Sequence, residues 1–558
     1  MDKRIAPVCT VPTRETLTVA FLRNFNEEAS GDAVIETAVG MTNAEGGTLY
    51  IGVDENGGAC GVKADERNDP EKIASFIASH TVPPLSVSAD CEEIDGKVIW
   101  VIQVPQSRGI VATRDGRVLK RRVTVDGRPG TFPLYPTEFI SRLSEIGRLD
   151  YSAMTLPDTS ADDFDAVERY RLRDFIRQNR GEDGLAELED AEFDKALGLV
   201  RETRDGAVPT VAGLLLIGKR NVIRRRLPGA GAVFEDFAGA KRGVSEDFVL
   251  PLLDSFDALL LRFRARQVES EWMDGLVRVA VPAYSEYAFR EALVNAFCHR
   301  DYARPGRIAV RMFDDGLAIT SPGGFMSGLT PENLLTAPSR SRNPLLAEIF
   351  RRIGLAEGCG RGIERIAEGN LRYGRPLPDF SESDEETVRV VLPKCEADQE
   401  FHKFLIRSQR RPEVKIGFSD LLILSAIRFA GSLTLAGLLE STHLPERRIE
   451  RHLRILTEKE LLEGVGNGDD REWMLKGCRD KEEPCTEALM RFSGTNVERR
   501  EALVMKWART HSTLTRGDVM TLLGLEGQTV YRLLKRLVER GLLIREGTKR
   551  GSVYRMPE

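Results

Sequence analysis

The sequence predicts a multidomain α+β protein. The chain has 558 residues, and at about 150 residues per domain this length suggests three to five domains. Short apolar strand patterns alternate with helical patterns over residues 15–145 and again over 276–394. Two similar helical segments, 413–476 and 497–557, close the chain, and each ends in a glycine-containing hairpin pattern. A chain of this length exceeds what one hydrophobic core usually serves.

The composition is that of a soluble globular protein. Hydrophobic residues make up 41% and charged residues 30% of the chain, which excludes a disordered or fibrous protein. The formal charge of −6 excludes a uniformly basic nucleic-acid coat protein, but leaves room for a basic patch on one domain. The 8 cysteines include no C-x-x-C pair, although a scattered metal site stays open. Without a long apolar run or a signal peptide, we expect a cytoplasmic protein that does not enter a membrane.

The first mixed region opens with a helix pattern over Asp32–Asn43. The pattern breaks at Gly46 and Gly47, and the apolar strand Thr48–Val53 follows at once. Glycines accept positive φ and suit such a junction, so a simple helix-to-strand turn explains them equally well. A second strand is predicted over Lys97–Val104.

This region resembles the Schlafen-type AlbA-like domain over residues 13–145. The match is carried by Glu15–Val19, Asn43–Val53, Gly57–Val62 and Gln103–Ser107. The resemblance implies an α/β domain that contacts nucleic acid, with RNA and single-stranded DNA among its partners. The family often has E-F-K where Ala20-Phe21-Leu22 stands here. Metal-assisted cleavage needs clustered carboxylates, so we do not expect a nuclease.

A basic stretch lies within this first region. Its residues are Arg108, Arg114, Arg117, Lys120, Arg121 and Arg122. Such a stretch suits contacts to phosphates. A solvated strand edge is the alternative interpretation.

A middle region is expected over residues 160–275, after the acidic link 157–165. Within it the apolar run Pro209–Gly218 predicts the end of a helix and a buried strand. Residues 395–412 are predicted to form a linker.

A third region, 276–394, holds the residues that suggest chemistry. Tyr287–Tyr302 predicts a helix that buries Phe289, Leu293 and Phe297. Glu291 and Asn295, four residues apart, are neighbours on one face, and a carboxylate beside an amide can position water or hold Mg²⁺ near a triphosphate. An exposed polar pair is the alternative interpretation.

Two glycine segments follow this helix. The strands 307–313 and 317–320 flank a turn at Asp314–Gly316, and the second strand breaks at Ser321-Pro322-Gly323-Gly324. Gly354–Glu364 is a glycine-rich turn opening a helix, a pattern whose backbone N–H groups can bind phosphate. A Walker A motif is absent from the sequence, and a Rossmann interpretation fails because no clear strand precedes the turn.

Together these segments resemble the ATPase domain shared by gyrase, histidine kinases and MutL-type proteins (GHKL), and more closely its divergent form in bacterial RecG-like proteins and predicted transcriptional regulators. The resemblance implies an α/β sandwich that binds ATP and Mg²⁺, with Glu291 as general base and Asn295 as metal ligand. The nucleotide-binding residues that it implies are Asn295, Gly323, Gly324, Gly358, Gly360, Arg361 and Gly362. The adenine-reading aspartate of the superfamily is missing before Gly323, and Asp315 is the nearest acidic residue. A degenerate domain kept for dimerisation or as a scaffold is the alternative.

His299-Arg300-Asp301 allow two interpretations. Histidine is an acid–base group at neutral pH, and Arg300 is a candidate for a phosphate contact. We favour the alternative that His299 belongs to a group capping the helix end.

The C-terminal segments resemble winged helix-turn-helix domains. In the first copy, 413–476, a helix over Pro445–Leu456 carries Arg447, Arg448, Arg451 and Arg454. In the second, 497–557, the candidate recognition helix 528–540 turns Val530, Leu533, Leu534 and Leu537 inward. The residues assigned to DNA are Gln528, Thr529, Arg532, Lys535, Arg536, Lys549 and Arg550. A winged helix used for protein contacts is the alternative.

We therefore expect an ATP-binding, DNA-binding regulator, most simply of transcription. Residues 497–558 hold 13 Lys and Arg and 7 Asp and Glu, a local charge of +6, which suits double-stranded DNA. We expect a homo-oligomer with weak ATPase activity at most. An ATP-dependent nucleic-acid-processing or anti-phage defence effector is the rival function.

Overall fold

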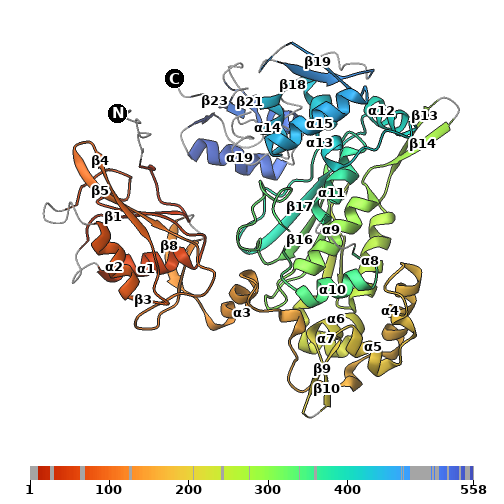
Figure 1. The fold of residues 1–558 in the computed structure, drawn as a ribbon, viewed down its shortest axis with the longest axis horizontal. Coiled ribbons are helices and arrows are strands. Elements are labelled where there is room, and N and C mark those ends of the chain that lie inside the picture. The colour runs from red at the N-terminus through yellow and green to blue at the C-terminus, as the bar shows by residue number, and fades with distance from the viewer. Residues whose placement is uncertain are drawn as a thin grey trace. The chain divides into compact units, whose positions relative to one another are not determined.

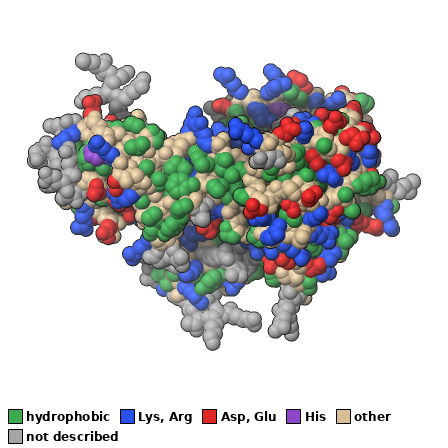
Figure 2. Space-filling model, turned by 90° about the horizontal axis from the view of Figure 1, so that it is seen from below, with side chains coloured by type: hydrophobic (Ala, Val, Ile, Leu, Met, Phe, Trp, Pro, Cys, Tyr) green, Lys and Arg blue, Asp and Glu red, His purple; other side chains and the backbone are tan. Residues whose placement is uncertain are grey.

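The computed structural model describes residues 11–25, 31–62, 70–124, 128–204, 206–239, 244–274, 277–338, 340–356, 361–466, 468, 471–477, 504–505, 508, 514–523, 527–539, 542–546 and 553–556. The chain divides into two compact units, residues 1–149 and 150–558 (Figure 1). Both mix strands and helices, so the protein is a multidomain chain of mixed α/β architecture. On the face drawn in Figure 2, Lys and Arg side chains are interspersed with Asp and Glu side chains.

The first unit is built on a four-stranded sheet of order β1-β2-β5-β4, in which only the β1–β2 pair is parallel. Its elements are β1 (Val19–Leu22), α1 (Gly31–Thr42), β2 (Gly47–Ile51), α2 (Pro70–Ser79), β3 (Thr81–Val82), β4 (Ser88–Ile94), β5 (Lys97–Val104), β6 (Ala112–Thr113), β7 (Leu119–Val123), β8 (Pro129–Pro133) and α3 (Pro136–Glu145). Apolar side chains of α1, α2 and the sheet share one core. The predicted helix 32–43 and strands 48–53 and 97–104 are confirmed as α1, β2 and β5.

The junction between α1 and β2 requires glycine. Gly46 and Gly47 have φ of +75° and +133°, a region that other residues rarely adopt. A Cβ atom at Gly47 would lie 2.1 Å from the carbonyl oxygen of Thr18. The paired glycines therefore let β2 start directly beside β1.

The second unit contains a five-stranded sheet of order β12-β11-β15-β16-β17. The elements up to this sheet's last strand are α4 (Ala166–Gln178), α5 (Asp190–Ala196), β9 (Val200–Thr203), β10 (Gly206–Pro209), α6 (Val211–Ile217), α7 (Arg220–Arg226), β11 (Ala232–Asp236), β12 (Val244–Phe248), α8 (Leu252–Arg264), β13 (Glu269–Asp274), β14 (Val277–Pro282), α9 (Glu286–His299), β15 (Ile308–Met312), β16 (Gly316–Pro322), α10 (Pro344–Arg352), α11 (Gly362–Leu371) and β17 (Thr387–Pro393). β11 pairs with β15, so the boundary predicted at 275/276 separates strands of one sheet.

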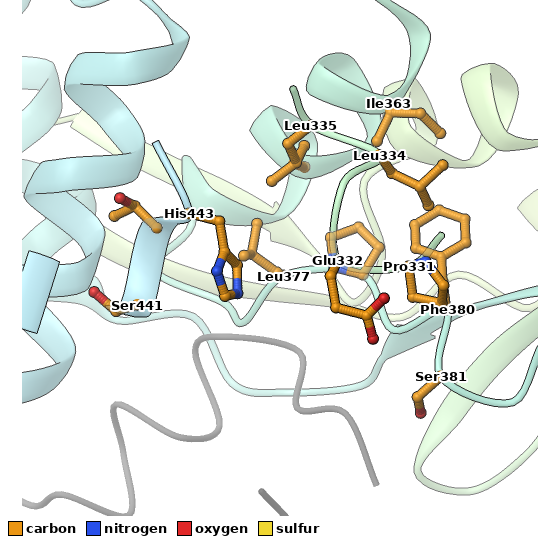
Figure 3. Close-up of a pocket in the computed structure, with 13 residues that line it drawn as sticks. Pro331, Glu332, Leu334, Leu335, Ile363, Leu377, Phe380, Ser381, Ser441 and His443 are labelled. Atoms are coloured by element: carbon orange, nitrogen blue, oxygen red, sulfur yellow. The ribbon is translucent and has the colours of Figure 1, made fainter. Parts of the chain in front are cut away.

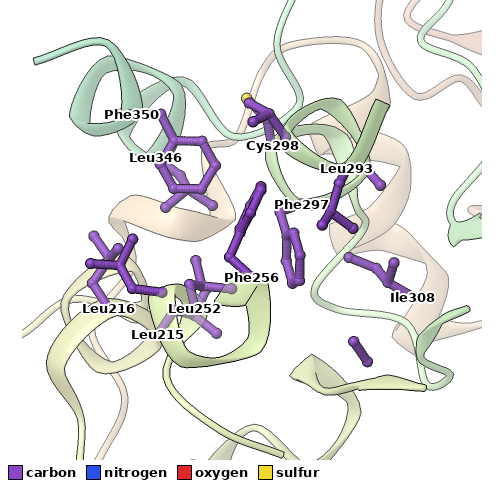
Figure 4. Close-up of a cluster of buried hydrophobic side chains, with 14 of the residues drawn as sticks. Leu215, Leu216, Leu252, Phe256, Leu293, Phe297, Cys298, Ile308, Leu346 and Phe350 are labelled. Carbon is purple, nitrogen blue, oxygen red and sulfur yellow. The ribbon is translucent and has the colours of Figure 1, made fainter. Parts of the chain in front are cut away.

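One large core supports this sheet. Apolar side chains of α6, α8, α9 and α10 meet there, among them Leu216, Phe256, Phe297 and Phe350 (Figure 4). The core runs from Phe164 to Leu392 in sequence. The middle region and the third region of the sequence thus fold together.

Two predictions for this unit are wrong. Residues 211–217 form the helix α6 and no strand, and the Thr210 hydroxyl caps it by accepting from Gly213 N at 3.1 Å. All seven residues of α6 are buried, and a short, uniformly apolar run does not distinguish a buried helix from a strand. The predicted linker 395–412 contains the helix α12 (Gln399–Gln409), which buries Phe401, Phe404 and Leu405.

The chain then forms two similar arrangements of a strand, two helices and a hairpin. The first follows a further helix, α13 (Phe418–Ala430), and comprises β18 (Ser432–Thr434), α14 (Leu435–Thr442), α15 (Glu446–Glu458), β19 (Leu462–Val465) and β20 (Glu472–Leu475). The second comprises β21 (Leu514–Thr515), α18 (Arg516–Leu523), α19 (Gly527–Glu539), β22 (Ile544–Glu546) and β23 (Val553–Arg555). Their sheets have the equivalent orders β18-β20-β19 and β21-β23-β22. The internal repeat predicted from the sequence is thus present in the topology.

Within the described ranges, no helix combines the length and apolar character needed to cross a bilayer.

Candidate functional site

Helix α9 presents two different faces. Phe289, Leu293 and Phe297 are fully buried in the core, as predicted. Ser285 starts the helix by accepting a hydrogen bond from Ala288 N at 3.2 Å. With the apolar face fixed, Glu291 and Asn295 are turned to the opposite side, where both line a cavity.

This cavity has a volume of about 490 Å³. It brings together the predicted residues Glu291, Asn295, Gly323, Gly324, Arg361 and Gly362. They come from α9, from the end of β16 and from the start of α11. The volume lies within the range of small-molecule sites, which is roughly 300–1,000 Å³. Gly358 and Gly360 lie outside the described residues.

Gly362 allows α11 to begin directly on the polar face of α9. A Cβ atom at this position would lie 2.8 Å from Asn295 Nδ2 and 3.0 Å from Glu291 Oε1. At such distances a larger residue would displace the ends of these two side chains, so glycine leaves both of them in place. The helix N-terminus, with its unpaired N–H groups and positive end of the dipole, is thereby held beside a carboxylate and an amide.

Gly323 and Gly324 have mainly a packing role. Gly323 has a φ of +95°, and a Cβ there would lie 2.7 Å from Asp301 Cβ. Their backbone N–H groups donate to Glu386 O at 2.6 Å and to Glu385 O at 3.2 Å. Because these donors are already used, the two glycines shape the cavity wall and do not offer their N–H groups to a ligand.

The electrostatics of the cavity centre on Glu291. Burial raises the pKa of this carboxyl, while the charges of Arg365 and Arg290 act in the opposite direction. Arg365 Nη1 lies 3.8 Å from Glu291 Oε2, and both side chains are largely buried. Asn295 Nδ2 is buried and has no hydrogen-bond partner within the described part of the chain. A buried amide in that state is a group to which a ligand can bind.

His299-Arg300-Asp301 tie the end of α9 to its surroundings. Arg300 is fully buried and donates to Gly229 O at 2.6 Å and Gly306 O at 2.7 Å. Asp301 accepts from Ala303 N at 3.0 Å. These contacts support the capping interpretation, and Arg300 does not line the cavity. The His299 ring lines the cavity, and burial together with the charge of Arg342 lowers the pKa of His299 to about 4, so the ring is neutral at physiological pH.

Asp315 does not replace the missing adenine-reading aspartate. It precedes Gly316 at one end of β16, whereas Ser321 and Gly323 lie at the other end. A strand rises about 3.3 Å per residue, so the two ends lie roughly 20 Å apart. Ser321 lines the cavity instead, and its hydroxyl donates to Ala296 O at 3.0 Å.

Four arginines in or beside the cavity were not predicted as site residues. Arg340, Arg342 and Arg351 line the cavity, and Arg365 faces Glu291. Arg342 donates to His299 O and Gly324 O and so fixes the cavity wall. The arginine-rich segment Ser339–Pro344 was the available signal, because cations near a glycine turn suit an anionic ligand.

In the first unit, much of the basic stretch is structural. Arg121 is buried and donates to Thr16 O and Val19 O at 3.0 Å each. Arg122 pairs with Glu138 at 3.0 Å, and Arg117 pairs with Glu36 and Asp115. The Glu15 carboxylate accepts from Phe21 N at 2.9 Å and lies 3.2 Å from Arg121. In the described ranges no group of three His, Cys, Asp or Glu side chains is placed to hold a metal ion.

The two C-terminal arrangements present basic helices. On α15, Ile449, Leu453 and Leu456 are buried while Arg447, Arg448, Arg451 and Arg454 are exposed. None of these four guanidinium groups has a carboxylate within 4.0 Å in the portion of the chain that the structure describes. On α19, Val530, Leu533, Leu534 and Leu537 are buried as predicted, and Lys535 and Arg536 are exposed. The side chains of Gln528, Thr529 and Arg532, and residues Lys549 and Arg550, lie outside the described residues.

Three family models match separate parts of the chain. Residues 15–126 match "Schlafen, AlbA_2", and residues 141–231 match a domain of unknown function, DUF8451. Residues 306–392 match "Putative ATP-dependent DNA helicase recG C-terminal", a HATPase-type model. The last match begins after α9, so Glu291 and Asn295 lie outside the matched residues. They are next to the matched region only because α9 packs against it.

A solved structure is similar along most of its length. The DIP2311 protein from Corynebacterium diphtheriae shares 19% identity, with 97% of this chain and 95% of that chain covered and a TM-score of 0.48. A comparison with curated proteins finds none that matches. The family models show that this chain carries a Schlafen/AlbA_2 domain and a RecG-C-terminal-like HATPase domain, a combination that indicates an ATP-binding, nucleic-acid-associated protein.

Proposed function

We propose that this protein is an ATP-dependent DNA-binding regulator, most simply of transcription. Its nucleotide would occupy a GHKL-type site in the 490 Å³ cavity, and its C-terminal arrangements would act as winged helices. The observation that carries the proposal is the convergence of Glu291, Asn295 and the start of α11 on one cavity wall. The HATPase-type family match over 306–392 supports it.

The cavity fits ATP with Mg²⁺ chemically. Asn295 Nδ2 is buried and has no hydrogen-bond partner in the described chain, so it would donate to a phosphate oxygen. The amide oxygen of the same side chain would hold the cation. The N–H groups at the start of α11 would donate hydrogen bonds to phosphate oxygens. Bound Mg²⁺ supplies positive charge that offsets the charge of the phosphates. Glu291 would orient a water molecule and accept its proton, which gives the weak ATPase activity expected from the sequence.

The C-terminal helices supply the proposed DNA contacts. In each copy the second helix lies between a first helix and a two-stranded hairpin, the order of a winged helix. The four exposed arginines of α15 and the exposed Lys535 and Arg536 of α19 suit contacts to phosphates and base edges of duplex DNA. The Schlafen/AlbA_2 domain would add contacts to RNA or single-stranded DNA.

Nucleotide binding by isothermal titration of the intact protein, with and without Mg²⁺, tests the proposal. We expect ATP to bind the wild type, and Asn295→Ala to weaken binding at least about tenfold, or 1.4 kcal/mol. Glu291→Ala removes the proposed base and no phosphate contact, so this variant should still bind ATP and lose hydrolysis. The Asn295→Ala variant should also lose most of the Mg²⁺ dependence. Glu286→Ala, on the same helix but outside the cavity lining, is the matched control. Absence of ATP and ADP binding by the wild type would refute the nucleotide function.

A further inference from the structure

Helix α11 belongs to two hydrophobic cores at once. Ile366 is buried in the large core that also contains Leu293 of α9. Its neighbour Ala367, together with Leu371, is buried in the core formed by α12, α13, α14 and α15. A single helix of ten residues therefore packs both against the large core beside the cavity, which we call the core of the cavity domain, and against the first C-terminal arrangement.

The contact between α11 and α9 is unusually close. Besides Gly362, a Cβ atom at Gly369 would lie 2.7 Å from both Ala288 Cβ and Ser285 Oγ. Glycines at both ends of α11 thus allow the two helices to touch along the whole length of α11. If a ligand displaces the start of α11, the contact between α11 and α9 has no slack to take up that displacement, because packed cores resist continuous deformation.

The larger cavity shares a wall with a second, smaller one. Leu334, Ile363 and Phe380 line both cavities, and we call these three side chains the partition. The smaller cavity has a volume of about 70 Å³. On its other side lie Ser441, Thr442 and His443, at the end of α14 where the chain turns toward α15 (Figure 3).

The smaller cavity leaves the partition room to move. Its 70 Å³ corresponds to about two water molecules at roughly 30 Å³ each. A gap of this size can take up a shift of the apolar side chains that face it, which a close-packed wall would resist. The residues that they would then reach belong to the turn between α14 and α15.

We propose that nucleotide in the larger cavity pushes the partition into the smaller one and thereby tightens the α14–α15 turn. This inference rests on the proposed function, because it assigns the regulation of that same site. Ile363 is the second residue of α11, so a phosphate bound at the start of α11 acts directly on the partition. A ligand shifts a conformation only through different interactions with its two states, and the partition provides that difference.

Amide hydrogen exchange of the full-length protein, measured by mass spectrometry, tests the coupling without DNA. The probe is a non-hydrolysable ATP analogue with Mg²⁺, whose binding is measured in parallel by calorimetry. We expect exchange over residues 435–446 to slow at least twofold on binding, since filled contacts at the turn lower local opening. DNA binding is not needed for this readout.

Two variants test the movement of the partition, one by shortening it and one by filling the space into which it would move. Ile363→Ala truncates it, and Ser381→Val fills the smaller cavity, which Ser381 lines with a buried hydroxyl that has no hydrogen-bond partner in the described chain. Both should lose the slowing over 435–446 at analogue concentrations that calorimetry shows to saturate each variant. Val388→Ala, which trims an apolar side chain from the larger cavity alone, is the matched control and should keep it.

The outcomes separate this inference from the proposed function. Analogue binding with exchange changes confined to the larger cavity's lining would overturn the coupling and leave the nucleotide function intact. Unchanged slowing in both partition variants would overturn it as well. No analogue binding by the wild type would refute the nucleotide function, and this inference with it.

Discussion

At the scale of single residues, Glu291 determines the expected pH dependence of ATP hydrolysis. Burial raises the pKa of its carboxyl, and Arg365 at 3.8 Å opposes the rise. A general base works only when ionised, so the rate should fall as the pH drops through this raised pKa. Arg365→Met removes the opposing charge, raises the pKa of Glu291 further and should move the acidic limb of the kcat profile to higher pH. Arg365→Lys should restore it, and an unmoved limb in Arg365→Met would contradict the role of Arg365.

Gly362 gives a steric prediction at the same scale. In Gly362→Ala the new Cβ would lie 2.8 Å from Asn295 Nδ2 and 3.0 Å from Glu291 Oε1. We expect an overpacking cost of about 1–3 kcal/mol in unfolding free energy and an ATP affinity at least about tenfold weaker by calorimetry. Gly417→Ala makes the same change before α13, where the nearest atom to a new Cβ is 3.7 Å away, and should bind ATP normally. Normal ATP binding in Gly362→Ala would contradict the steric role assigned to Gly362.

Sequence patterns reached some residues of the site and missed others for a physical reason. Glu291 and Asn295 were accessible because helical spacing places residues four apart on one face. Arg342 and Arg365 lie far along the chain from them, and packing alone brings Arg342 into the cavity lining and Arg365 beside Glu291. Such long-range neighbours leave no trace in local spacing. The engaged N–H groups of Gly323 and Gly324 likewise depend on a partner more than sixty residues later in sequence.

At the scale of elements, α15 carries the clearest prediction about DNA. Its four arginines are exposed and have no carboxylate within 4.0 Å in the described ranges. Arg447→Ala combined with Arg451→Ala should weaken duplex DNA binding and lower the slope of log K against log salt by about 1.8, at roughly 0.9 per phosphate contact. Fluorescence anisotropy across a salt series measures this slope. Arg224→Ala with Arg225→Ala on α7 removes the same charge elsewhere, and equal effects of the two pairs would argue against α15.

Element prediction succeeded where a pattern has two distinct faces. The buried leucines of α15 and α19 recur at helical spacing between charged residues, and the sequence located both helices. α6 was mistaken for a strand because all its residues are buried, so no polar face revealed the helical period. α12 is the exception: Phe401, Phe404 and Leu405 recur at helical spacing, but the polar residues around them are also typical of a linker, and the core that they join is formed by later helices.

At the scale of the whole molecule, the described hydrophobic clusters divide between the two units. Those of residues 1–149 contain Trp100, and those of residues 150–558 contain the cavity domain. A ligand that binds only the second unit should stabilise that unit alone, by about 2.7 kcal/mol at a concentration a hundredfold above Kd. Trp100 is the only tryptophan before residue 150, and the other three stand at 272, 473 and 507.

A chain with Trp272→Phe, Trp473→Phe and Trp507→Phe therefore reports on the first unit by fluorescence, and a Trp100→Phe chain reports on the second. In thermal melts with ATP and Mg²⁺, we expect the second reporter's midpoint to rise and the first reporter's midpoint to stay unchanged. The Asn295→Ala change added to either chain should abolish the rise, which controls for non-specific effects of nucleotide. If both reporters shift together, the two units unfold cooperatively and nucleotide energy reaches the Schlafen/AlbA_2 domain. That outcome would contradict the expectation that the two units respond to the ligand independently.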